Sequence, residues 1–463
     1  MNVFHQYDIR GIYGKELDER FAYNLGKAVL KYTDAHKIII GYDSRNGNLK
    51  LFSSLSKSIM EQGIDIVHAG LVTKPLLNWV AWKHRYDLAI YISASHNPKE
   101  YNGFKFVWNR KLLSYDHGLK DIESLMQKGV DCQLSRKKGK IVSIDYIDEY
   151  VKFLSGNLSK DFRSYMKNHN FRIIADASNG SAGETIKRFL LKNDLTYELL
   201  FTNPDGEFPG HNPNPLFAEA MNPISKKMPA FKADIGFVVD PDADRIRFVD
   251  EKGNIVDNNF MDCLVVENLL SRRGAKKGSA IVHDLIARKI LSETISKCGG
   301  KPVESKVGVT NIASSMKKEK ATFGSEMSGH RIFSSMDYMD SALLMLVYVL
   351  NTLCSKKNAG KKLSSLWKKY DKYPDVGELN YKLSDGKDKQ AVMDAIQKHF
   401  TDNKKRYGVK EIFNLDGVSV VAKRYWFNVR LSNTEPLLRL RVEGTDKRSL
   451  AELKKILEKF IVG

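Results

Sequence analysis

Leu88-Ala-Ile-Tyr-Ile-Ser-Ala-Ser-His-Asn-Pro98 is the stretch that decides the fold class, because a short apolar run leads directly into a polar turn. A run of this length bounded by turn signals is typical of a strand that is buried on both faces. Asn97-Pro98 then directs the chain away from the strand. Ser95 is therefore expected at the carboxyl end of a strand, the edge where open α/β sheets bind ligands. A serine that only stabilises the turn is the alternative at this point.

The same alternation of short apolar runs and amphipathic stretches continues on both sides of this strand. It predicts strands at 37–42, 65–68, 88–92, 171–176, 197–201, 235–239, 279–283, 302–305 and 321–323. Three α/β units with parallel strands therefore follow one another.

The C-terminal part of the chain has a different pattern. It predicts strands at 379–383, 417–421, 426–431 and 438–442, one helix near 389–400, and a closing helix from Ser449. This pattern indicates an α+β domain with a mostly antiparallel sheet. A chain of 463 residues is too long for one core. The predicted domains are 1–142, 143–253, 254–365 and 366–463.

The composition, 42% hydrophobic and 28% charged, is that of a folded protein. Lys and Arg total 74 against 55 Asp and Glu, and the net charge of +19 favours anionic partners. Phosphorylated metabolites and nucleic acid both qualify. The basic clusters lack interleaved aromatic residues and zinc-finger spacing, so a specific nucleic-acid partner is not expected.

The four cysteines show no CxxC pairing, which predicts neither a zinc site nor a disulfide framework and indicates a reducing compartment. The longest apolar run, 342–350, is too short to span a membrane, and no apolar segment follows the N-terminus. We expect a cytoplasmic protein without a membrane partner, acting as a monomer or a homodimer.

Asp240-Pro-Asp-Ala-Asp-Arg245 follows another apolar strand and carries three carboxylates at alternate positions. These carboxylates would repel one another unless a cation neutralised them, and Mg²⁺ prefers such oxygen ligands. The spacing also resembles the start of an EF-hand. Arg245 stands where that motif requires glycine, and 246–250 alternates like a strand, so a magnesium loop is the better interpretation.

Two further polar loops follow strands. Gly324-Ser-Glu-Met-Ser-Gly-His330 offers groups that read sugar hydroxyls, although an ordinary polar loop would look similar. Arg430-Leu-Ser-Asn-Thr-Glu-Pro436 offers a guanidinium, hydroxyls and an amide, which suit a phosphate, although a simple β-turn is the alternative.

Together these loops resemble the α-D-phosphohexomutase family, and within it the phosphomannomutase/phosphoglucomutase group. The motifs that carry the resemblance are Tyr7-Asp-Ile-Arg-Gly11, Gly41-Tyr-Asp-Ser-Arg45, Ser95-His-Asn-Pro98, Tyr101-Asn-Gly-Phe-Lys105, Asp240 to Arg245, Gly324 to His330 and Arg430 to Pro436. The resemblance implies three doubly wound mixed-sheet α/β domains and a C-terminal α+β domain around a central cleft.

The resemblance also implies the roles of individual residues. Ser95 would carry the phosphoryl group, and the metal ligands would be Asp240, Asp242, Asp244 and the phosphoserine. Lys105 and His330 are the hypothesised proton-transfer groups, with Arg10 and Arg245 supplying positive charge. The remaining residues assigned to substrate binding are Tyr7, Glu326, Ser328, Arg430, Ser432, Asn433, Thr434 and Arg439.

The implied reaction interconverts hexose 1-phosphate and hexose 6-phosphate through a hexose 1,6-bisphosphate, which would also serve as activator. Met327 favours mannose and glucose phosphates. A phosphoglucosamine mutase or phosphopentomutase of the same family, and an inactive sugar-phosphate-binding protein, are the alternatives. Three departures from the family pattern affect these expectations: Pro241 in the metal loop, Ile286 where a lysine is common, and a 308–312 loop without its usual His and Lys.

Overall fold

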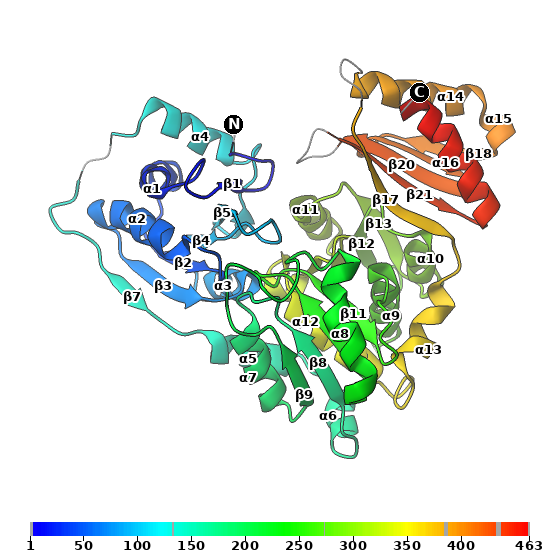
Figure 1. The fold of residues 1–463 in the computed structure, drawn as a ribbon, viewed down its shortest axis with the longest axis horizontal. Coiled ribbons are helices and arrows are strands. Elements are labelled where there is room, and N and C mark those ends of the chain that lie inside the picture. Colours follow the sequence, from blue (N-terminus) through cyan, green and yellow to red (C-terminus); the bar gives the residue numbers. More distant parts are fainter. Residues whose placement is uncertain (1–2, 132–133, 273, 384–387, 432–436, 462–463) are drawn as a thin grey trace. The chain divides into compact units, whose positions relative to one another are not determined.

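The computed structural model describes residues 3–131, 134–272, 274–383, 388–431 and 437–461. The chain forms two compact units, which are described separately (Figure 1). Unit 1 contains residues 1–261 and 328–366, and unit 2 contains residues 262–327 and 367–463.

The first sheet of unit 1 has the strand order β1-β5-β4-β2-β3-β7, with β6 paired to β5. Its strands are β1 (Ile9–Ile12), β2 (Ile38–Tyr42), β3 (Ile66–Leu71), β4 (Leu88–Ile92), β5 (Tyr101–Trp108), β6 (Lys111–Leu112) and β7 (Ile141–Ser143). Its helices are α1 (Glu19–Thr33), α2 (Asn48–Glu61), α3 (Lys74–Lys83) and α4 (Leu119–Lys128). Strands β2 and β4 are parallel and fully buried, as an unbroken apolar run predicts. Helices α1, α2 and α4 share one core with this sheet.

The second sheet of unit 1 has the order β11-β10-β8-β9. Its strands are β8 (Arg172–Asp176), β9 (Thr196–Leu200), β10 (Ile235–Val239) and β11 (Ile246–Asp250). The neighbouring helices are α5 (Ile147–Gly156), α6 (Lys160–Met166), α7 (Gly183–Lys192) and α8 (Ala218–Phe231). Strands β10 and β11 are antiparallel, so residues 240–245 form the turn of a hairpin at the end of the buried β10.

A second segment of the chain completes unit 1. It comprises β15 (Arg331–Phe333), the 3-10 turn η1 (Ser334–Met336), β16 (Met339–Asp340) and α12 (Ala342–Leu353). Strands β15 and β16 form an antiparallel hairpin. Helix α12 packs against α5, α6 and β11, which anchors the hairpin within unit 1. Helices α9 (Asn258–Ser271) and α13 (Leu363–Trp367), the latter followed by η2 (Lys368–Tyr370), lie at the boundaries between the two units.

Unit 2 begins with three parallel strands in the order β13-β12-β14. These are β12 (Ala280–Asp284), β13 (Lys301–Ser305) and β14 (Phe323–Ser325), with helices α10 (Lys289–Lys297) and α11 (Val309–Glu319). The C-terminal sheet is antiparallel, in the order β17-β21-β20-β19-β18. It comprises β17 (Asp375–Tyr381), β18 (Val409–Phe413), β19 (Val418–Ala422), β20 (Tyr425–Leu431) and β21 (Leu438–Gly444), with α14 (Lys389–Asp402), α15 (Lys404–Tyr407) and α16 (Lys447–Ile461).

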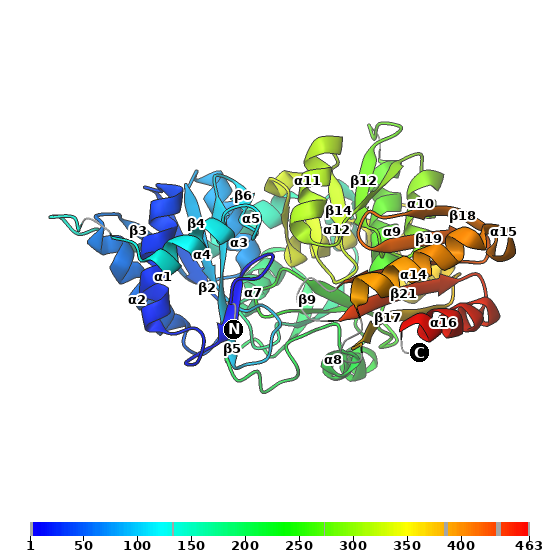
Figure 2. The same ribbon diagram turned by 90° about the horizontal axis from the view of Figure 1, so that it is seen from above.

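One face of the C-terminal sheet is apolar and the other is polar. Helices α14 and α16 lie along the sheet in both ribbon views (Figures 1 and 2). They share a core with the alternate residues Leu438, Leu440 and Val442 of β21. Because side chains alternate along a strand, the intervening arginines of β21 line the opposite face.

The predicted fold class is confirmed: the chain is an α/β protein of four domains, and its last sheet is antiparallel. The strand predicted at 88–92 is β4 without a shift, and the alternating segment 246–250 is β11. The domain boundaries stay predictions. In the part of the chain that the structure describes, no helix combines the length and apolar character needed to cross a membrane.

Candidate active site

Ser95 follows β4 and has a left-handed backbone, with φ at 55°. Its N–H donates to Ser93 Oγ at 2.7 Å, and Ser93 Oγ donates to Asp43 Oδ2 at 2.6 Å. The buried Arg45 guanidinium donates to the carbonyl oxygens of Ser95 at 2.6 Å and Pro98 at 2.8 Å. These bonds hold the serine in a backbone conformation that is unfavourable for any residue with a Cβ.

The Asp240–Arg245 turn brings its three aspartates to Ser95. Asp240 Oδ1 accepts the N–H groups of Asp244 at 3.1 Å and Arg245 at 3.0 Å, which closes the turn. Ser95 Oγ lies 3.3 Å from Asp240 Oδ2 and 3.1 Å from Asp242 Oδ1. The structure therefore places a hydroxyl from one sheet against carboxylates from another within unit 1.

The three aspartates form a donor set that suits a hard divalent cation. Each is fully buried, and one oxygen from each lies within 4.8 Å of the others. Burial raises the pKa of Asp240 well above its usual value, and repulsion from Asp244 and Asp242 adds to that rise. Asp244 Oδ1 has no hydrogen-bond partner among the described residues. A divalent ion with oxygen ligands would compensate both the charge and the orphaned oxygen.

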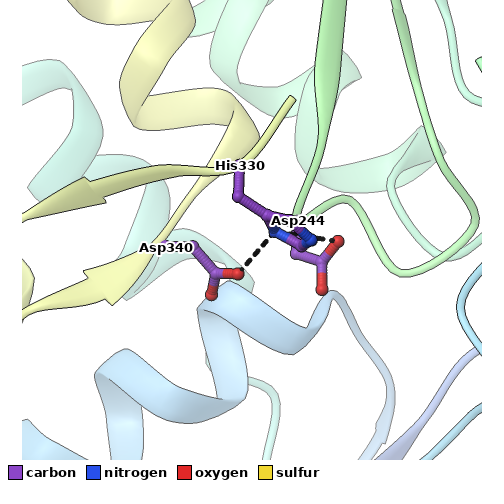
Figure 3. A group of neighbouring side chains, drawn as sticks. All are labelled: Asp244, His330 and Asp340. Atoms are coloured by element: carbon purple, nitrogen blue, oxygen red, sulfur yellow. Dashed lines mark ion pairs between the residues drawn. The ribbon is translucent and has the colours of Figure 1, made fainter. Parts of the chain in front are cut away.

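Asp244 also belongs to a second group of possible ligands, with His330 and Asp340 (Figure 3). This second group already contains a cation: the buried Lys74 Nζ lies 2.5 Å from Asp244 Oδ2 and 2.9 Å from Asp340 Oδ2. Burial acts to lower the pKa of Lys74, but the two carboxylates outweigh burial and raise that pKa, so the ammonium keeps its charge. Lys105 Nζ likewise lies 2.7 Å from Asp242 Oδ2, so a neighbouring cation does not distinguish the two groups. Asp240, Asp242 and Asp244 are the better candidate for the magnesium site because all three ligands are carboxylates and Ser95 Oγ adjoins two of them.

Lys105 and Arg10 lie on the strands next to the serine loop. Lys105, on β5, is buried with Nζ 2.7 Å from Asp242 Oδ2. Arg10, on β1, donates to Asn97 Oδ1 at 2.6 Å. Strand β5 pairs with both β1 and β4, so the sheet itself brings these two cations to Ser95.

His330 and Arg245 contact each other. Arg245 Nε donates to His330 Nε2 at 2.9 Å, and the two residues form an isolated antiparallel bridge. Because an arginine keeps its protons, Nε2 must be the accepting nitrogen. His330 Nδ1 lies 2.8 Å from Asp340 Oδ2 (Figure 3). Nε2 is thus hydrogen-bonded to Arg245, whereas Nδ1 lies close to Asp340 without a hydrogen bond in the described part of the chain.

Unit 2 contains a separate polar site. Glu326 is buried beyond β14, and Asp284 is fully buried at the end of β12. Met327 N–H donates to Asp284 Oδ2 at 2.8 Å. Burial, followed by repulsion from Glu326, raises the pKa of Asp284 to about 8. On the C-terminal sheet, Arg430 is almost fully buried.

The other predicted site residues are placed as follows. Tyr7 lies half-buried before β1, and Ser328 is half-buried in unit 1, with its hydroxyl shielded from solvent. Arg439 lies opposite Arg430 in the β20–β21 pair. Ser432, Asn433 and Thr434 fall outside the described residues.

The roles of several residues of the site were not predicted from the sequence. Lys74 and Asp340 lie in stretches without a polar motif and meet Asp244 only through tertiary folding. Asp43 and Arg45 belong to a quoted motif, but their contacts with the serine loop were not predicted. Ile286, where a lysine was expected, is buried, and its carbonyl accepts from Arg441 Nε at 3.3 Å.

Family models match nearly the whole chain. The models are described as phosphoglucomutase/phosphomannomutase alpha/beta/alpha domains I, II and III and the C-terminal domain, at residues 1–131, 148–253, 257–373 and 378–459. The chain is 35% identical over 457 residues to a phosphomannomutase of Methanocaldococcus jannaschii, covering 97% of this chain and 95% of that protein. It is 31% identical over 480 residues to a phosphomannomutase of Vibrio cholerae, covering 99% of both.

Solved structures show the same fold. A phosphoglucomutase/phosphomannomutase family protein of Burkholderia thailandensis has a TM-score of 0.86 at 26% identity, covering 99% of this chain and 96% of that one. A phosphoglucomutase of Paramecium has a TM-score of 0.79 at 16% identity, covering 98% and 94%. The chain therefore belongs to the phosphoglucomutase/phosphomannomutase family, and it is a phosphohexomutase enzyme.

Proposed function

We propose that the enzyme interconverts hexose 1-phosphate and hexose 6-phosphate, with mannose or glucose as the sugar, through a phosphoserine at position 95. The observation that carries this proposal is the 3.1 Å distance between Ser95 Oγ and Asp242 Oδ1 within a buried carboxylate triplet. A serine hydroxyl against carboxylates that suit a divalent cation is an arrangement that serves phosphoryl transfer, because it positions a phosphate carrier next to a charge-neutralising metal site.

The proposed reaction passes one phosphoryl group from enzyme to sugar and another back. The oxygen of the sugar's free hydroxyl bonds to phosphorus and releases its proton, while the bond between phosphorus and Ser95 Oγ breaks and Oγ takes up a proton, giving a hexose 1,6-bisphosphate. After the bisphosphate turns around, its other phosphoryl group returns to Ser95. Mg²⁺ held by Asp240, Asp242, Asp244 and the phosphoserine would supply charge neutralisation for the transferred group.

The two proposed proton-transfer groups differ in geometry. Lys105 Nζ contacts Asp242, which itself adjoins Ser95 Oγ. Both nitrogens of His330 face protein partners, Arg245 and Asp340. These contacts favour Lys105 for proton transfer and favour His330 as a residue that orients Arg245. If Lys105→Ala retained near-normal turnover, the role proposed for Lys105 would be withdrawn.

The sugar and its non-reacting phosphate are proposed to bind through unit 2 and the loop that follows β14. Glu326 would accept hydrogen bonds from the O3 and O4 hydroxyls, and Ser328 would donate to or accept from the same hydroxyls. Arg430 and Arg439 would hold the phosphate. Mannose and glucose differ only at C2, so a loop that grips O3 and O4 separates them weakly. Dual specificity is therefore expected.

The experiment compares three substrates in one assay. Purified enzyme with Mg²⁺ and a trace of glucose 1,6-bisphosphate as activator is given mannose 1-phosphate, glucose 1-phosphate or glucosamine 1-phosphate, and the 6-phosphates are quantified. Mannose and glucose phosphates should be converted faster than glucosamine phosphate, and Ser95→Ala should convert none. A preference for glucosamine phosphate would overturn the proposed sugar class but leave the phosphoserine route standing.

A further inference from the structure

Glu378 lies on the polar face of the C-terminal sheet, among its arginines. Strand β21 pairs with β17 on one side and with β20 on the other, and Arg430 is directly opposite Arg439. The apolar residues of these strands pack against α14 and α16. The sheet therefore gathers Glu378 and the two arginines on the opposite face.

One carboxylate serves two guanidinium groups there. Glu378 Oε2 accepts from Arg430 Nη2 at 2.7 Å, and Glu378 Oε1 accepts from Arg439 Nη1 at 3.0 Å. Arg430 is only 2% exposed, and its Nε has no hydrogen-bond partner in the described part of the chain.

The neighbouring arginine shows a different arrangement. Both terminal nitrogens of Arg441 bond to the two carboxylate oxygens of Asp375, the second at 2.7 Å. In such a bidentate pair, one carboxylate forms hydrogen bonds with both terminal nitrogens of one guanidinium. Arg430 and Arg439 instead both donate to the carboxylate of Glu378, in the manner in which two arginines surround a phosphate.

We propose that Glu378 occupies the position of the substrate's non-reacting phosphate between Arg430 and Arg439, and that a phosphate must displace it in order to bind. This inference rests on the proposed function, which assigns these arginines to that phosphate. Glu378 then keeps two close guanidinium groups from repelling each other when no ligand is bound. It also weakens phosphate binding, because a carboxylate competes for the same donors and repels the arriving anion.

Competition between Glu378 and the phosphate for the two arginines would help the proposed reaction to proceed. Before the cycle can finish, the arginines must release one phosphate of the bisphosphate and bind its other phosphate. A binding site that held either phosphate too tightly would slow that exchange, since binding the intermediate strongly does not itself accelerate the reaction. Glu378 supplies a replacement anion at the moment of release.

The direct test measures binding of inorganic phosphate to the full chain by calorimetry, in EDTA so that no divalent ion contributes. Glu378→Gln keeps the shape and removes the charge, and it should bind phosphate about tenfold more tightly than the wild type. Glu411→Gln, an exposed glutamate on β18 of the same sheet, should match the wild type. Unchanged or weaker binding in Glu378→Gln would overturn the proposal, because a glutamate that merely orients Arg430 predicts weaker binding.

A second measurement separates this inference from the proposed function. Arg430→Met should reduce phosphate binding; if it does not, the assignment of the phosphate site fails, whatever Glu378 does. In turnover with hexose phosphate, Glu378→Gln should lower both KM and kcat, since a tighter phosphate site slows release. A raised KM in that variant, with its thermal unfolding unchanged, would contradict the displacement model.

Discussion

Ser95 shows how far a single residue can be understood from its sequence. The apolar run and the Asn-Pro turn predict a serine at a strand's carboxyl edge, and the structure has it there. The left-handed φ of 55° could not be predicted, because it depends on Arg45 and Asp43, which are distant in sequence. The strained backbone at Ser95 thus accompanies the orientation that points its hydroxyl toward the aspartates.

This strain can be measured with a matched pair of variants. Ser95→Ala and Ser95→Gly both remove the hydroxyl, but only glycine adopts a positive φ without a Cβ clash. After the entropic cost of glycine is subtracted, Ser95→Gly should be more stable than Ser95→Ala by about 0.5–1 kcal/mol. Urea unfolding of both variants checks this, and a less stable glycine variant would show that the φ is not a strained feature.

The metal assignment is also argued at the level of residues. Asp242→Asn removes one charge from the triplet without changing its shape, so we expect Mn²⁺ affinity, measured by electron paramagnetic resonance, to fall at least about 100-fold. Activity should fall with it. Asp375→Asn, in the C-terminal sheet of unit 2, is the control and should bind Mn²⁺ normally. Equal affinity in Asp242→Asn and wild type would rule out the triplet as the metal site.

At the scale of elements, the carboxyl ends of strands were the most predictable feature. Strands β4 and β10 have the predicted bounds, whereas β14 lies two residues later than the predicted 321–323, and each of the three leads into a polar loop. The first residue of α3 was not expected to contribute to the site. Its first residue, Lys74, reaches Asp244 and Asp340, which are 170 and 266 positions away, so no local pattern could reveal the contact.

Lys74 should therefore be essential for the stability of unit 1. Lys74→Met leaves two buried carboxylates without their cation, and removing one partner of a buried ion pair typically costs about 3–5 kcal/mol. The double variant Lys74→Met/Asp340→Asn removes one of those charges and should recover part of the loss. Thermal unfolding in EDTA tests both variants. A single variant as stable as the wild type would mean that Lys74 is not needed to neutralise the cluster.

The end of β12 gives a pH-dependent prediction. Folding raises the pKa of Asp284 from its usual 3.8 to about 8. Between these values the folded state holds a proton that the unfolded state has lost. The stability contributed by this proton is complete below pH 3.8 and is lost as the pH rises through 8.

Asp284→Asn mimics the protonated carboxyl and should be insensitive to this titration. Its stability advantage over the wild type should grow by at least about 1 kcal/mol between pH 5 and pH 8, as measured by chemical unfolding at both values. An advantage that stays constant or shrinks toward pH 8 would show that Asp284 titrates normally.

At the scale of the whole molecule, the order of the motifs along the chain said more about the family than the composition did. The net charge of +19 left both metabolites and nucleic acid open, whereas seven motifs in order along the chain indicated the family that the comparisons show. The paired carboxylates and cations that complete the sites, such as Asp340 with Lys74 and Glu378 with Arg430, join distant parts of the chain. Such pairs follow from the tertiary fold, which local sequence patterns do not specify.

The most direct test of the proposed mechanism is the mass of the intact protein after incubation with Mg²⁺ and glucose 1,6-bisphosphate. The wild type should gain one phosphoryl group, located by fragmentation on Ser95, and should lose it again when excess hexose monophosphate is added. Ser95→Ala should gain none. A phosphoryl group on another residue, or a Ser95→Ala variant that still turns over substrate, would contradict the claim that this serine carries the phosphoryl group.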